Sequence, residues 1–137
     1  MALKPSFTWT SRLMVAQVSV ANANRDGTGD VQLLGAGVAA STNGPGGTKV
    51  FRITAKATGT TTAGVVRIYV STDNGATKRL FHEFAVSAIS AAADTPTWSG
   101  SATFDDFVLP DANAKLYAST ERAEAFNIFV DGGDLTG

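Results

Sequence analysis

The only histidine of the chain, His82, is the first residue to test for catalytic chemistry. A Ser-His-Asp triad needs an imidazole within reach of a nucleophile and a carboxylate, and here that imidazole would have to be His82. Residues 78–87 alternate between apolar and polar, and His82 shares its predicted face with Leu80, Phe84 and Val86. A lone histidine on an apolar face is more often a hydrogen-bonded structural residue, so we predict no catalytic role for it.

The segment 22–27 suggests calcium, because its pattern Asn-x-Asn-x-Asp-Gly matches the first half of a calcium-binding loop. The twelfth position of such a loop is a bidentate Glu, and in this chain it is Leu33. An Asx-type turn between two strands explains the same residues. The chain also contains no cysteine, which excludes thiolate metal sites. We therefore predict no metal and no cofactor.

Two further motifs fail the tests for enzymatic chemistry. Asp105 and Asp106 are adjacent, and neighbours in a strand point to opposite faces unless a bulge intervenes. The Gly-rich segment 44–49 lacks the spacing of a phosphate-binding loop, G-x-x-x-x-G-K-[ST]. We therefore expect no catalytic residues and no enzymatic activity.

The composition describes one small domain with few charges. The chain has 137 residues, and its 11 basic residues face 12 acidic ones without a basic run, which argues against nucleic-acid binding. Charged residues make up 17%, below the ~25% of an average soluble domain. No segment reaches the ~20 apolar residues of a membrane-spanning helix. A surface of small, uncharged residues is less costly to bury against a partner, which favours a component of an assembly.

The periodicity predicts strands throughout the chain. Apolar and polar residues alternate in several short segments separated by turn residues, and no segment predicts a helix of about ten residues. The predicted strands cover residues 14–20, 31–38, 50–57, 65–70, 78–87, 98–109, 115–120 and 126–131. This spacing predicts an all-β, single-domain antiparallel β-sandwich of about eight strands, similar to a jelly roll, with an immunoglobulin-like sandwich as the alternative.

Alternation also predicts which side chains share a face. Phe51, Ile53 and Ala55 fall on one side of their strand, which we expect to be the core side. Asn74-Gly75 predicts a type I′ hairpin turn, because both central residues of that turn need a positive φ.

Residues 1–12 form a separate segment in our interpretation, and residues 13–137 form the β-sandwich domain. One reading makes the first segment an edge strand with two core aromatic residues. The other makes it an extended arm that lays Phe7 and Trp9 on a neighbouring molecule. We name Phe7, Trp9 and Arg12 as candidate partner contacts.

Three parts of the sequence carry a family resemblance. They are residues 15–29 (VAQVSVANANRDGTG), residues 51–67 (FRITAKATGTTTAGVVR), and an ending made of residues 109–120, 125–128 and 132–134. These parts, which together span most of the chain, resemble a group of short proteins encoded by tailed bacteriophages.

The resemblance implies a structural virion protein, and the role that fits best is a head decoration, or cement, protein. Such a protein would be made in the bacterial host cytoplasm and would bind the exterior of the assembled capsid as a trimer. Its implied partners are the major capsid protein and further copies of itself, and it brings no catalytic residue. The alternative is a fibre or tail adhesin that binds host-surface glycans through exposed Trp9, Tyr69, Trp98 or Tyr117.

Overall fold

The structure is a computed structural model that describes residues 9–40 and 45–135. These residues form strands joined by loops and turns, and they contain no helix, so none that could span a membrane. In chain order the strands are β1 (Trp9–Val18), β2 (Gln32–Ala36), β3 (Thr48–Ala57), β4 (Gly64–Ser71), β5 (Arg79–Val86), β6 (Ser99–Leu109), β7 (Lys115–Thr120) and β8 (Phe126–Leu135). The prediction of an all-β chain of about eight strands is confirmed.

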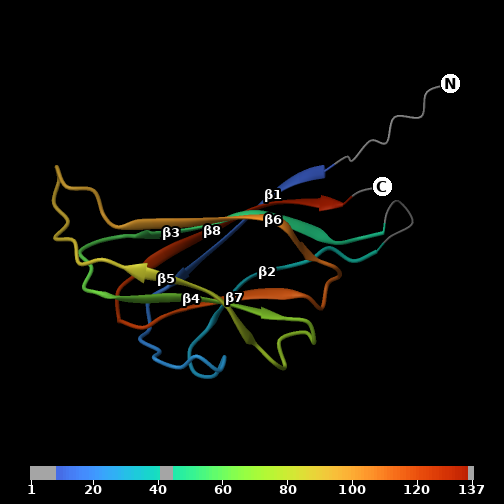
Figure 1. Ribbon diagram of the computed structural model, residues 1–137, viewed down its shortest axis with the longest axis horizontal. Helices are drawn as coiled ribbons and strands as arrows, with labels where there is room; N and C mark the ends of the chain where they lie inside the picture. Colours follow the sequence, from blue (N-terminus) through green and yellow to red (C-terminus); the bar gives the residue numbers. More distant parts are fainter. Residues whose placement is uncertain (1–8, 41–44, 136–137) are drawn as a thin grey trace.

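The strands form two antiparallel sheets that face each other (Figure 1). One sheet has the order β1-β8-β3-β6, and the other has the order β2-β7-β4-β5. The first strand therefore pairs with the last, the second with the seventh, the third with the sixth, and the fourth with the fifth. This is the topology of a jelly roll, in which one long hairpin is rolled into a sandwich. The immunoglobulin-like alternative is wrong. In that fold the first two strands share a sheet, whereas β1 and β2 lie in different sheets here.

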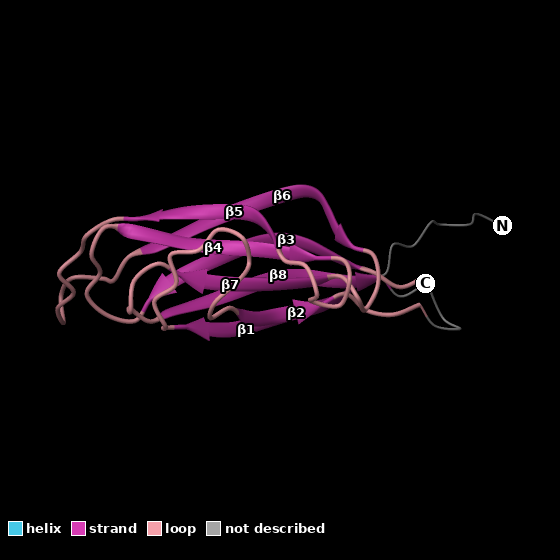
Figure 2. Cartoon of the chain, turned by 90° about the horizontal axis from the view of Figure 1, so that it is seen from below, coloured by secondary structure: helices cyan, strands magenta, loops and turns pink. Residues whose placement is uncertain are grey.

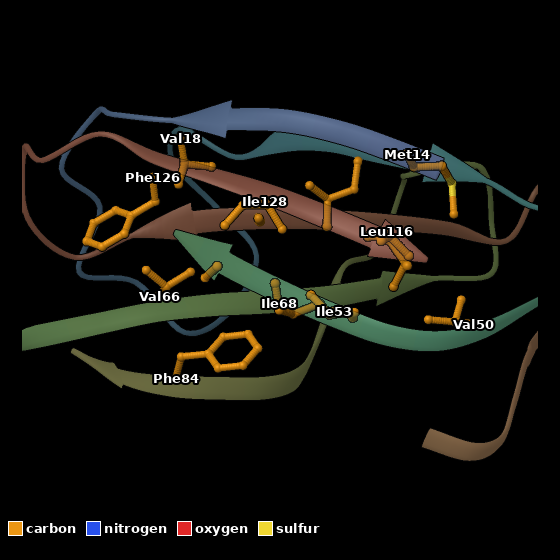
Figure 3. Packing of buried hydrophobic residues seen from close by; sticks show 14 of the residues in the cluster. Met14, Val18, Val50, Ile53, Val66, Ile68, Phe84, Leu116, Phe126 and Ile128 are labelled. Atoms are coloured by element: carbon orange, nitrogen blue, oxygen red, sulfur yellow. The ribbon is translucent and has the colours of Figure 1, made fainter. Parts of the chain in front are cut away.

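The core fills the space between the two sheets (Figure 3). Each sheet contributes one face of alternating apolar side chains, as period-2 patterning requires. Ile53 of β3, Ile68 of β4 and Ile128 of β8 have no solvent-exposed surface. Phe84 and Phe126 lie toward one end of this core, and Met14 and Val50 lie toward the other (Figure 3).

A bulge in the β3 pairings changes which residues of that strand face the core. The register shifts between Val50 and Arg52 in the pairings with both β6 and β8, which makes Phe51 the extra residue of the bulge. Val50 is fully buried and Phe51 is 41% exposed. The prediction that Phe51 shares the core face with Ile53 is therefore wrong, because one extra residue reverses the alternation.

A second bulge, in β5, has the same effect on Leu80. Ile68 pairs with His82 and Tyr69 pairs with Leu80, so Phe81 is the extra residue. Leu80 is exposed and does not share the core face with Phe84, contrary to the prediction. Phe84 itself is buried, as predicted.

The turn at Asn74-Gly75 has the predicted backbone conformation, but it lies in a longer connection than expected. Both residues have positive φ, 61° and 90°, as a type I′ turn requires. The connection from β4 to β5 nevertheless spans residues 72–78, which is longer than a two-residue hairpin loop. The Ser71 hydroxyl accepts a hydrogen bond from the backbone N–H of Gly75 at 2.8 Å and helps to close this longer loop.

The first strand begins earlier than the predicted domain boundary. β1 starts at Trp9, and its register with β8 runs without a break from Trp9↔Leu135 to Val18↔Phe126. Residues 9–12, which we assigned to the N-terminal segment, therefore belong to the sheet. Phe7 lies outside the described residues.

The fully buried Ile53 offers a test of the core. We expect Ile53→Ala to lower the free energy of unfolding by about 2–5 kcal/mol, because it removes buried methyl groups and leaves a cavity. The neighbouring Arg52→Ala, on the exposed side of the same strand, serves as the control and should change stability by less than about 0.5 kcal/mol. Urea denaturation measures both values, and equal losses would contradict the assigned orientation of β3.

Candidate contact surface

The outer face of the β2-β7-β4-β5 sheet is partly covered by the chain itself. Residues 19–31, which connect β1 to β2 and which we call the cover loop, cross this face (Figure 1, in blue below β4 and β7). Arg67 and Tyr69 point away from the core, yet they are only 1% and 0% exposed. Arg67 Nη1 donates to the carbonyl oxygen of Asn22 at 3.2 Å, and Tyr69 Oη donates to that of Asn24 at 2.7 Å.

A carboxylate shared by two arginines fastens the cover loop to β4 and β5. Glu83 Oε2 accepts hydrogen bonds from Arg25 Nε of the loop at 3.0 Å and from Arg67 Nε at 3.2 Å. The hydrogen bond from Arg25, and after it the one from Arg67, holds the pKa of Glu83 below its ordinary value of 4.5, although burial acts in the opposite direction. The ion pairs therefore contribute to the position of the loop.

The residues that resembled a calcium loop hold the cover loop in shape. Asn22 Nδ2 donates to the carbonyl oxygens of Thr28 and Asp30, both at 2.9 Å, and Asn22 Oδ1 accepts from the N–H of Asn24 at 3.0 Å. Asp26 Oδ1 accepts from the N–H of Thr28 at 3.0 Å. These are the local side-chain-to-backbone bonds of Asx turns. Within residues 9–40 and 45–135, no group of three or more His, Asp or Glu side chains could hold a metal ion.

The outer face of the β1-β8-β3-β6 sheet, which we call the open face, presents apolar side chains to solvent. Leu13 and Val15 of β1 are 60% and 52% exposed, and the bulge residue Phe51 joins them. Leu13 lies opposite Asp131 of β8, which lies opposite Arg52 of β3. The open face is therefore a mixed surface, in which exposed apolar side chains lie among polar ones such as Gln17 and Thr103 and beside the facing pair Arg52 and Asp131.

A shallow depression of about 420 Å³ lies on the open face. It is lined by Ser11, Arg12, Leu13, Phe51, Asp131 and Gly132, and we call it the Phe51 depression. Only glycine fits at position 132, because a Cβ there would lie 2.6 Å from the carbonyl oxygen of Lys49. The depression, beside the bulge residue Phe51, is of a size that admits an apolar side chain from another molecule.

Arg12, a candidate partner contact, has partners within the chain. Its Nη1 donates to the carbonyl oxygen of Ala36 at 2.7 Å and lies 3.3 Å from Asp134 Oδ1. Thr48 Oγ1 donates to the same Asp134 oxygen at 2.7 Å. The guanidinium therefore connects β1 to β2 and β8, and Arg12 contributes to the depression as part of its wall.

His82 and the adjacent carboxylates lie at the opposite long side of the sandwich. The His82 ring packs edge-on to Phe84, with centroids 4.5 Å apart, and Phe81 packs against Phe107 at the same distance. Between the paired residues Thr103 and Phe107, residues 104–106 of β6 lie opposite the single residue 51 of β3, so Asp105 and Asp106 occupy an irregular stretch. The aromatic rings close the gap between β5 and β6, and the two carboxylates are exposed at its rim.

The aromatic residues considered for glycan binding are mostly inaccessible. Tyr69 lies beneath the cover loop, and Trp98 is buried with its ring against Phe126. Tyr117 is half-buried, with Lys78 Nζ 4.8 Å from its ring centroid. A sugar stacks on an exposed ring face, and these three residues offer little of one.

Comparison with known proteins adds no family: no protein-family model matches this chain, and no curated protein matches it. The candidate site therefore depends on the geometry of the chain alone. Sequence reasoning missed Leu13, Val15 and Phe51 as surface residues. A signal was present for Val15, an apolar residue on the polar side of the β1 alternation, whereas the exposure of Phe51 depends on a bulge that local alternation does not reveal.

The attachment of the cover loop should depend on pH. The pKa of Glu83 is lower in the folded chain than in the unfolded one, so its contribution is fully present above its ordinary value of 4.5 and is lost as the pH falls through the folded value. We expect Glu83→Gln to lower the stability at pH 7 by about 1 kcal/mol. The difference between wild type and variant should shrink below pH 4.5.

Thermal unfolding between pH 7 and pH 3 measures this difference. Asp106→Asn, at an exposed carboxylate far from the loop, controls for the loss of one negative charge. A difference between wild type and Glu83→Gln that stayed constant over the whole pH range would contradict the role assigned to Glu83.

Proposed function

We propose that this protein is a structural virion protein that binds the exterior of an assembled phage capsid and stabilises it as a decoration protein, without catalysis. The observation that carries the proposal is the asymmetry of the two outer faces. The centre of one face is covered by the chain's own loop, which leaves Leu33 and Leu80 exposed on the edge strands β2 and β5, whereas the open face presents Leu13, Val15 and Phe51 around a shallow depression. The sequence resemblance to short phage proteins supports the same role.

The open face suits a contact with another protein surface. Apolar side chains that are exposed in the free chain release water when a partner covers them, at roughly 25 cal/mol per Å² of apolar surface. The charged residues Arg52 and Asp131 lie opposite each other on β3 and β8, so a partner that covers this face does not have to bury either charge far from an opposite one. A side chain of the major capsid protein that enters the Phe51 depression would anchor the contact.

The stabilising mechanism is mass action. A protein that binds the assembled shell, and not its separated subunits, shifts the equilibrium toward the shell. Many copies on a symmetric lattice multiply a modest contact through multivalency. The rigid jelly roll serves this role because it holds the open face in one shape before binding, which lowers the entropy cost of association.

The adhesin alternative gains no support from the described residues. Glycan binding through stacking would need exposed tyrosine or tryptophan rings, and Tyr69 and Trp98 are buried. We therefore retain a single proposed function.

A capsid-binding experiment tests the proposal. We expect the purified protein to sediment with shells of its phage that lack it, and to raise the temperature at which those shells disrupt. Phe51→Asp should weaken this binding by at least about tenfold, because it removes the exposed aromatic ring and adds a second carboxylate to the depression that Asp131 already lines, at a cost above 1.4 kcal/mol.

The control is Thr103→Asp, which adds the same charge to an exposed residue of β6 in the same sheet. It should bind shells like wild type. Both variants should keep the wild-type thermal stability, since both positions are exposed. Failure of the wild-type protein to bind shells would overturn the function, and equal binding by Phe51→Asp would overturn the assigned surface.

A further inference from the structure

The four edge strands of the sandwich differ in how they are protected. β6 is irregular at residues 104–106 and presents two exposed aspartates there, β5 has its bulge at Phe81, and β2 has five residues with a register shift. Bulges, short length and charges are the devices that keep an edge strand from pairing with another chain. Three of the four edges therefore carry such a device.

β1 carries only one such feature, the charge of Arg12, and that guanidinium is bound to Ala36 and Asp134 of its own chain. Its ten residues pair with β8 in one unbroken register, without a bulge or a proline. From Ser11 to Val18, the side of β1 that faces away from β8 lies at one long side of the sandwich beside β2 (Figure 2), and no backbone hydrogen bond joins these two strands in the described chain. A long, regular edge with exposed Leu13 and Val15 is a template for pairing with another strand.

We propose that β1 pairs antiparallel with β1 of a second copy of this chain, about a two-fold axis normal to the sheet. In an antiparallel pair of identical strands, the residue numbers of opposite positions have a constant sum. That sum must be even for the outward-facing residues to meet each other, and the outward-facing residues Leu13 and Val15 have odd numbers. When the axis passes at residue 13, 14 or 15, Leu13 or Val15 of one copy lies opposite one of the same two residues of the other copy.

Charge favours a second copy as the occupant of this edge. Arg12 is the only charged residue of β1, and its guanidinium is held by Ala36 and Asp134 of its own chain. Two β1 edges can therefore approach each other without bringing unpaired like charges together, a combination that would oppose self-pairing. The net charge of −1 per chain adds little repulsion between copies.

The pairing would join two four-stranded sheets into one continuous sheet with the two open faces side by side. The contact is isologous, so it closes with two copies and leaves no free β1 edge. The family resemblance implies a trimer instead, and the mass of the protein in solution distinguishes the two. This inference does not rest on capsid binding, and its tests use the purified protein alone.

The first test is the mass by light scattering across a concentration series. We expect about 28 kDa, twice the 14.1 kDa of the chain. Val15→Lys should give the monomer mass, because a lysine on the edge opposes pairing, whereas Thr103→Lys on β6 should leave the dimer intact. A monomeric or trimeric wild type, or a dimer that Val15→Lys does not disrupt, would overturn the proposal.

The second test uses the absence of cysteine in the chain. In the double variant Leu13→Cys/Val15→Cys, at least one thiol of each copy lies opposite a thiol of the other copy if the two-fold axis passes at residue 13, 14 or 15. We expect mild oxidation to give a covalent dimer, because opposite residues of paired strands lie within disulfide reach. Ser101→Cys/Thr103→Cys, with the same spacing on the exposed side of β6, is the control. Equal cross-linking of the two double variants would show random collision and would contradict pairing through β1.

Discussion

The difference between the two outer faces of this sandwich depends on the hydrogen bonds that hold the buried guanidinium of Arg67 under the cover loop. A strand in a two-layer sandwich normally buries one face and leaves the other in water. β4 buries both, because Arg67 is held between the Glu83 carboxylate and the Asn22 carbonyl oxygen under the cover loop. A buried charge without such partners would be strongly destabilising. The loop that satisfies Arg67 also removes the outer side of β4 around Arg67 and Tyr69 from the surface available to a partner.

The open face is a product of the jelly-roll topology. Because the chain is rolled so that its first and last strands pair, β8 lies between β1 and β3, and Leu13, Phe51 and Asp131 meet although they are far apart in sequence. Two local features then shape the surface. The bulge turns Phe51 outward. Gly132, which also lines the depression, has no Cβ and therefore lets the backbone of β8 lie close to the carbonyl oxygen of Lys49 in β3.

The open face and the β1 edge are suited to two different kinds of contact. The open face offers side chains, so its specificity depends on shape and apolar surface. The β1 edge offers backbone groups, so pairing there depends on the regularity of the strand rather than on particular side chains. A protein that uses both could pair with its own copy and still present one continuous surface to a shell. In this arrangement, the bulges and carboxylates of β5 and β6 keep the opposite side of the sandwich from pairing.

Alternation by itself determined the strands of this protein, since the apolar and polar side chains of each segment must separate between core and water. It placed Ile53 on the core side of its strand and predicted the positive-φ turn at Asn74-Gly75. Only the tertiary structure decided that Phe51 and Leu80 face outward, because a bulge depends on the register of the partner strand and reverses the alternation locally. Likewise, Arg67 and Tyr69 were on the side that alternation assigns to solvent. They are buried because a loop from another part of the chain, bound by hydrogen bonds and an ion pair, lies over them. The alternation of apolar and polar residues shows which strand conformation one segment prefers. The surface that a partner can reach depends also on which distant segments of the chain cover that strand.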